Sequence, residues 1–111
     1  MIDELDRFRY AERLFDGRHY ASAASELEGI LAACATEDPG HGLAAAELLL
    51  ARAYYHSAQL TRAETAARAY VETHPSDGYG VLLLARSIER QGRREEAAPL
   101  VARAEALGVT R

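Results

Sequence analysis

Histidine and cysteine are the residues of this chain whose chemistry is easiest to recognise from spacing, and they are widely scattered. The five residues are His19, Cys34, His41, His56 and His74. A structural zinc site needs such ligands in pairs a few residues apart, and no two of these five have that spacing. The sequence therefore predicts no metal site. A histidine on an exposed surface is also the plainest interpretation of His56, although its side chain titrates near neutral pH.

Cys34 is the only cysteine, which excludes a disulfide within the chain. It follows Leu27, Ile30 and Leu31 at helical spacing, so we expect a small buried core residue. A catalytic thiol would need a neighbouring histidine or a helix N-terminus, and the local sequence clearly supplies neither.

Short runs of charge complete the candidates for chemistry. Glu37–Asp38 is expected in a solvated loop, Glu95–Glu96 at the positive end of a helix, and Arg93–Arg94 is too short a basic run to indicate nucleic acid. The sequence contains no glycine-rich phosphate loop, nucleophile elbow or pair of carboxylates arranged for acid–base work. We therefore expect a protein that is not an enzyme and holds no cofactor.

Composition places these residues in a small globular protein. The chain has 111 residues, of which 49% are hydrophobic and 27% charged, with a net charge of −4. This balance favours neither nucleic acid nor an anionic membrane as a partner. The acidic start MIDELDRFRY does not resemble a secretory signal, and no apolar run approaches a membrane span, so we expect a cytoplasmic protein. All 13 basic residues are arginine, which together with the many alanines indicates a GC-rich bacterial genome.

An internal repeat in the sequence predicts the structural units that carry these residues. The segment Ala51–Tyr54 aligns with Ala85–Ile88 at a shift of 34 residues, and Ala11 aligns with Ala51 at a shift of 40. The six extra residues fall in the turn-rich stretch ATEDPGHG. Three copies are therefore predicted, at about residues 4–37, 44–77 and 78–111, with a longer loop at about 36–42.

Each copy is predicted to form two helices. In the second copy they cover residues 43–57 and 61–74, and Pro75 ends the second. Gly17 and Gly92 mark nearly the same turn between the helices of the first and third copies.

Capping residues support these boundaries. Thr61 stands three residues before Glu64, which is the spacing of a capping box, and Ser76 or Asp77 is expected to cap the following helix. Small residues recur where the two helices of a copy would cross closely. They are Ala11, Ala51 and Ala85 in the first helices and Ala23, Ala63 and Ala97 in the second.

With this period, these alanines and a closing proline, the chain resembles the tetratricopeptide repeat (TPR) family over about residues 4 to 111. The second copy, LLLARAYYHSAQLTRAETAARAYVETHPSD, resembles it most closely. The resemblance implies a single all-α domain, an α-solenoid of about six antiparallel helices in a right-handed superhelix. Two departures are the lack of tryptophan and Pro99 inside the last helix.

In this family the first helices of the repeats line a concave groove that binds ligands. Carried over by register, the resemblance implies that the groove comprises Phe8, Glu12, Phe15, Leu48, Leu49, Arg52, Tyr55, His56, Tyr79, Leu82, Leu83, Arg86 and Arg90. Arg52 and Arg86 hold equivalent positions and are expected to be exposed. The positions that clamp a chaperone tail in some members carry no lysine or asparagine here, which argues against that ligand.

The predicted function is therefore that of a protein-interaction adaptor or scaffold, in which the groove takes a peptide or helix and its arginines bind acidic groups. A plainer interpretation is that the leucines bury against each other between repeats and the arginines are solvated. A second hypothesis is a homodimer formed through the groove or through the last repeat. No capping helix follows that repeat, which would leave Val101, Ala104 and Leu107 uncovered.

Overall fold

The computed structural model describes residues 4–34 and 43–109, and within these ranges it contains six helices and no strand. The expected loop at 36–42 lies outside the described residues. The predicted all-α class is confirmed. The helices are α1 (Glu4–Asp16), α2 (Tyr20–Cys34), α3 (Leu43–His56), α4 (Leu60–Thr73), α5 (Gly78–Glu89) and α6 (Arg94–Ala106).

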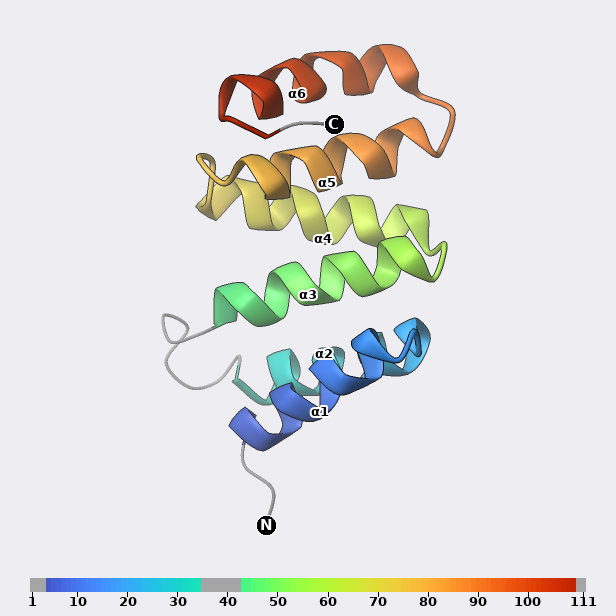
Figure 1. Cartoon of the computed structure of the whole chain (residues 1–111), viewed down its shortest axis with the longest axis vertical. Coiled ribbons are helices and arrows are strands. Elements are labelled where there is room, and N and C mark those ends of the chain that lie inside the picture. Colours follow the sequence, from blue (N-terminus) through green and yellow to red (C-terminus); the bar gives the residue numbers. More distant parts are fainter. Residues whose placement is uncertain (1–3, 35–42, 110–111) are drawn as a thin grey trace.

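Each helix packs against the helix that follows it in the chain, which gives an elongated stack of 47 × 27 × 21 Å (Figure 1). Helix α3 also touches α1 on one side and α5 on the other. Among the described residues, no helix is both long and apolar enough to cross a membrane.

Alanine makes the close helix crossings possible. The six alanines at the predicted crossing positions are all completely buried, which confirms the prediction. A side chain without atoms beyond Cβ lets two helix axes approach closely, and a larger one would force them apart. Two apolar cores form around these crossings. One contains residues of α1, α2 and α3 together with Ala63 of α4, and the other contains residues of α4, α5 and α6 together with Ala51 of α3.

The turns between the helices of each pair share one geometry. A residue with positive φ follows each first helix, at 67° for Arg18, 62° for Ala58 and 85° for Gly92. These three residues are equivalent under the shifts of 40 and 34 found in the sequence. In each turn the next N–H donates to a carbonyl five residues earlier: His19 to Leu14, Gln59 to Tyr54, and Arg93 to Ile88. Gly17 and Gly92 both lie in these turns, as expected, and in the first copy the positive φ falls on Arg18.

One of the two capping predictions is confirmed. Asp77 precedes α5, and its carboxylate accepts a hydrogen bond from the Gly80 N–H at 3.2 Å. The capping box at Thr61 is wrong, because α4 begins at Leu60 after Gln59 and no side chain caps it. Glu64 bonds instead to residues of the α5–α6 turn.

The ends of the described segments also test the sequence analysis. Cys34 is half-buried and packs against the first core, close to the expected buried position. At the other end Val101 and Ala104 are buried in the second core, so the expectation that they lack cover is wrong. Leu107 is 40% exposed.

Candidate functional site

Helices α1, α3 and α5 form one face of the stack, which we call the odd-helix face. Neighbouring helices of this set touch each other, whereas α2, α4 and α6 make no such mutual contacts over the described ranges. The odd-numbered helices are therefore the closer set. Side chains from two adjacent odd helices can line a shared cleft.

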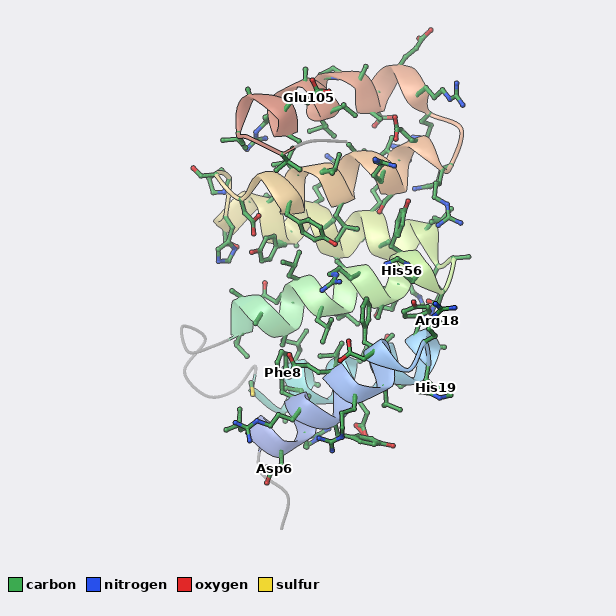
Figure 2. The ribbon with its side chains drawn as sticks, viewed as in Figure 1. Asp6, Phe8, Arg18, His19, His56 and Glu105 are labelled. Atoms are coloured by element: carbon green, nitrogen blue, oxygen red, sulfur yellow. The ribbon has the colours of Figure 1, made fainter. Side chains whose placement is uncertain are left out.

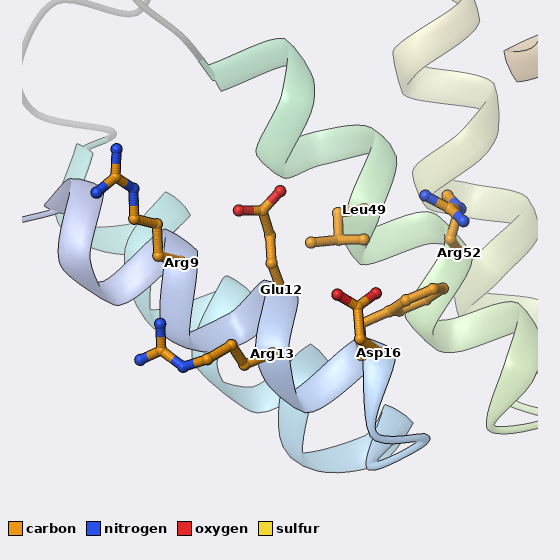
Figure 3. A pocket seen from close by; sticks show the side chains of 7 residues that line it. Arg9, Glu12, Arg13, Asp16, Leu49 and Arg52 are labelled. Atoms are coloured by element: carbon orange, nitrogen blue, oxygen red, sulfur yellow. The ribbon is translucent and has the colours of Figure 1, made fainter.

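A first cleft, of about 400 Å³, lies between α1 and α3. Glu12 and Asp16 rise from α1 toward the space beside Leu49, while Arg13 extends away from it (Figure 3). Neither carboxylate forms an ion pair with another residue of the described ranges. The cleft is lined by Arg9, Glu12, Arg13, Phe15, Asp16, Leu49 and Arg52.

A second cleft, of about 190 Å³, lies between α3 and α5. Its walls are aromatic and aliphatic, with one arginine at the edge. All six lining residues belong to the groove predicted from the sequence: Tyr55, His56, Tyr79, Leu82, Leu83 and Arg86. These side chains come from α3 and α5, which are not consecutive in the sequence, and the alignment of the repeats placed them on one surface.

Three predicted groove residues line neither cleft. Phe8 is half-buried against the first core, and Leu48 is half-buried against the second. Arg90 is exposed, and its guanidinium lies 4.9 Å from the centre of the Tyr55 ring. Two leucines that do line clefts, Leu49 and Leu83, are only 7% and 6% exposed. For these leucines the plainer interpretation, burial between repeats, is the better one.

Arg52 connects the two clefts. Its guanidinium lies 4.6 Å from the centre of the Phe15 ring and 5.7 Å from that of Tyr79, so it lies close to one ring of each cleft. Both distances allow attraction between the cation and the ring quadrupole. The two rings therefore hold the guanidinium at the middle of the odd-helix face.

Arg52 and Arg86 are half-buried, and the expectation that they are exposed is wrong. The Nε atom of each is buried and has no hydrogen-bond acceptor within the described chain. A buried donor left without an acceptor destabilises a protein by about 1–3 kcal/mol. These two donors are therefore places where an added acceptor is favourable.

An aromatic cluster closes the face at the C-terminal end of α3. The ring of His56, which Figure 2 labels, stacks on Tyr20 with 4.9 Å between ring centres. It packs edge-to-face with Phe15 and Tyr55, with 5.6 and 5.4 Å between ring centres. Tyr20 is the first residue of α2, and sequence reasoning missed it. The signal that could have indicated it is its position directly after the turn between the two helices of a pair.

The environment of His56 is cationic as well as aromatic. Burial lowers the pKa of His56 below its usual value, and the positive charges of Arg52 and Arg90 lower it further. A histidine ordinarily titrates near neutral pH. The burial of His56 and its two arginine neighbours favour the neutral imidazole at that pH.

A larger hollow, of about 590 Å³, lies along α1 and α2 and shares Arg9 and Arg13 with the first cleft. The ion pair between Arg7 and Glu26, at 4.0 Å, ties α1 to α2 there. Sequence reasoning gave no sign of it. Its lining residues are Asp6, Arg7, Arg9, Tyr10, Arg13 and Glu26.

Neither a metal site in the described residues nor a similar known protein indicates a function for this chain. Within residues 4–34 and 43–109, no three histidine, cysteine or acidic side chains are grouped so as to hold a metal ion. Comparison with family models, with curated proteins and with solved structures gives no match. The arrangement of the odd-helix face therefore carries the functional argument.

Proposed function

We propose that the chain is a TPR-type solenoid of three helical pairs in a right-handed superhelix. Three observations support this architecture: the equivalent turns, the buried alanines at equivalent crossings, and the closer approach of the odd-numbered helices. In a curved stack the inner helices are the closer ones. The odd-helix face would then be the concave side.

We further propose that the protein is a non-catalytic interaction module that binds a peptide or helix of a partner protein on the odd-helix face. One observation carries this proposal: two clefts joined through Arg52, with aromatic rings beside arginines whose Nε donors have no acceptor. Tyrosine and arginine often dominate the energy of protein interfaces, and a cleft in a rigid helical scaffold costs little conformational entropy on binding.

Affinity capture from a lysate tests the site. The wild type is compared with the double variant Arg52→Glu, Arg86→Glu and with the control Arg62→Glu, Arg94→Glu. The control makes the same change in charge at exposed arginines on α4 and α6. A partner retained by the control and lost by the first variant would support the proposal. Equal capture by all three proteins would exclude the odd-helix face.

Self-association is the second candidate. Tyr79 is 42% exposed on the odd-helix face, and Leu107 is 40% exposed at the end of the stack, where Val101 and Ala104 are covered. A dimer through the face would bury Tyr79 beside the two clefts. Light scattering checks this: a monomer at high protein concentration contradicts it, and a dimer dispersed by Arg52→Glu supports it.

A further inference from the structure

Three arginines gather beside the second cleft: Arg86 lines it, and the guanidinium groups of Arg52 and Arg90 lie beside its rings Tyr79 and Tyr55. Arg52 and Arg86 come from α3 and α5, and Arg90 directly follows α5. Glu89 forms an ion pair with Arg86, with 4.0 Å between its Oε1 and the Nε of Arg86, and Glu12 and Asp16 line the first cleft together with Arg52. The chain as a whole has a net charge of −4, so this concentration of arginine is local.

The three guanidinium groups differ in how firmly they are engaged. Arg90 donates a hydrogen bond to the Tyr55 carbonyl at 3.3 Å. Arg52 and Arg86 lack an acceptor for Nε, and Arg86 has a side chain that is 39% exposed. A carboxylate accepts two parallel hydrogen bonds from a guanidinium and would supply the acceptor that the protein does not.

The second cleft, which Arg86 lines, is large enough for one bulky apolar side chain. Its volume is about 190 Å³, and a cavity of about 150 Å³ is large enough to hold a benzene ring. Tyr55, Leu82 and Leu83 supply apolar walls. An apolar group buried there would stand directly beside the arginines.

The neighbouring cleft argues against a polyanion. Glu12 and Asp16 line it, and their charges would repel a phosphate backbone that continued along the face. The second cleft has no carboxylate in its lining, so a single acidic group bound there meets less of this repulsion. The face therefore suits an isolated acidic group better than nucleic acid.

We propose that the second cleft binds a peptide segment in which an aspartate or glutamate stands next to a bulky apolar side chain. The carboxylate accepts hydrogen bonds from Arg52 and Arg86, and the apolar side chain enters the cleft lined by Tyr55, Leu82 and Leu83. This inference rests on the proposed function, since it names the ligand chemistry of the same face.

Selection from a random peptide library displayed on phage tests the ligand chemistry. Immobilised wild-type protein should enrich peptides that carry an acidic residue beside leucine, isoleucine, methionine or an aromatic residue. Changing that acid to its amide should weaken binding of the best peptide about 10- to 100-fold, the loss expected for hydrogen bonds to a charged group. High salt should weaken the acidic peptide more than its amide counterpart.

Charge reversal gives the second arm. Arg52→Glu, Arg86→Glu should lose the acidic peptides and enrich basic–apolar ones, and Arg62→Glu, Arg94→Glu should select as the wild type does. Circular dichroism checks folding, and Arg52→Gln, Arg86→Gln replaces the reversed variant if that variant unfolds. The glutamine variant should bind the best acidic peptide at least about 10-fold more weakly.

The outcomes separate this inference from the proposed function. Peptides that depend on the odd-helix face but show no acidic preference would overturn the inference and leave the proposed function standing. Failure to enrich any peptide that competes at this face would count against both. Acidic peptides that bind the charge-reversed variant as well as the wild type would overturn the inference alone.

Discussion

At both junctions between successive helical pairs, the second helix of one pair contacts the first helix of the next, but the polar contacts differ. At the junction between α4 and α5–α6, Glu64 accepts two hydrogen bonds from Arg93, at 2.7 and 3.1 Å, one from Gln91 at 2.9 Å and one from Arg68 at 3.0 Å. Arg93 also pairs with Glu96 at 2.8 Å. The cluster therefore ties α4 to the turn of the next pair.

At the equivalent place in the junction between α2 and α3–α4, the cluster is missing. Ala24 occupies the position of Glu64 and is buried, and Gln59 and Ser57 occupy those of Arg93 and Gln91. These two side chains bond to each other at 2.9 Å. Tyr54 donates instead to Glu28 on α2. Successive helical pairs with a similar backbone can therefore be joined by different polar contacts.

This difference predicts that α1 and α2 unfold locally more readily than the rest of the described chain. In stacked repeats the stability is close to a sum of terms for each repeat and each junction, so a weaker junction releases its end first. The four predictions that follow test this comparison.

Core truncation should have the largest effect. Leu27 on α2 and Leu84 on α5 are nearly or fully buried, and each leucine changed to alanine should lower the free energy of unfolding by about 2–5 kcal/mol. Leu27→Ala should raise amide hydrogen exchange mainly in α1 and α2. Leu84→Ala, the matched control, should raise it throughout α3 to α6. The same exchange pattern in both variants would contradict unequal junctions.

Removing the cluster should make the junctions more alike. Glu64→Ala places an alanine where the first junction has Ala24. The free energy of unfolding should fall by about 1–2 kcal/mol in chemical denaturation, because the arginines that lose this partner can be solvated. The Glu64 side chain is 15% exposed, so its own hydrogen bonds are sheltered from water. Glu72→Ala, at an exposed glutamate on the same helix, serves as the control and should change little. Equal effects of the two variants would show that the cluster does not stabilise the junction.

Acid should weaken the same junction. The hydrogen bond from Arg93 is the main cause that lowers the pKa of Glu64 from 4.5 to about 2, with Gln91 and Arg68 also lowering it and burial opposing. A carboxyl group with a lowered pKa in the folded state stabilises the protein above its unfolded pKa. This stabilisation is lost as the pH falls from about 4.5 to about 2. The free energy of unfolding should therefore decrease less over this range in Glu64→Gln than in the wild type, and equal slopes would exclude the linkage.

The turns should give the smallest effects. Ala58 has a φ of 62°, and left-handed backbone costs an L-residue about 1–2 kcal/mol. Ala58→Gly removes that strain but adds entropy to the unfolded chain, so a gain of about 0.5 kcal/mol is expected in thermal unfolding. Gly92→Ala should lose about 1 kcal/mol, since Gly92 has a φ of 85°. Opposite signs in the two turns would confirm their equivalence, whereas equal signs would contradict it.

Features that depend on one helix or on the repeat were predictable from the sequence, and features that depend on distant partners were not. Burial of Ala63 and capping by Asp77 follow from spacing and local chemistry. Glu64 was misassigned because its main partner, Arg93, lies 29 residues away. The spacing from Thr61 to Glu64 suggested a local cap, but the stronger charged partner binds the carboxylate.

The candidate site shows the same division. Register placed Tyr55, His56 and Arg86 on one cleft, because equivalent positions of repeated helices share a face. It did not reveal Tyr20, which reaches the cluster from another helix, or the degree to which Arg52 is covered by rings. Those depend on side-chain directions across helices, which the period of the sequence does not specify.

The packing of each helix mainly against its neighbours in the chain has a kinetic consequence. Most contacts join residues that are close in sequence, so little loop-closure entropy opposes their formation. Helical proteins with such local contacts fold in about microseconds to milliseconds, far faster than sheets whose strands pair over long separations. Folding can start within any of the three helical pairs and spread to the next, so the nucleus need not be the same in every molecule.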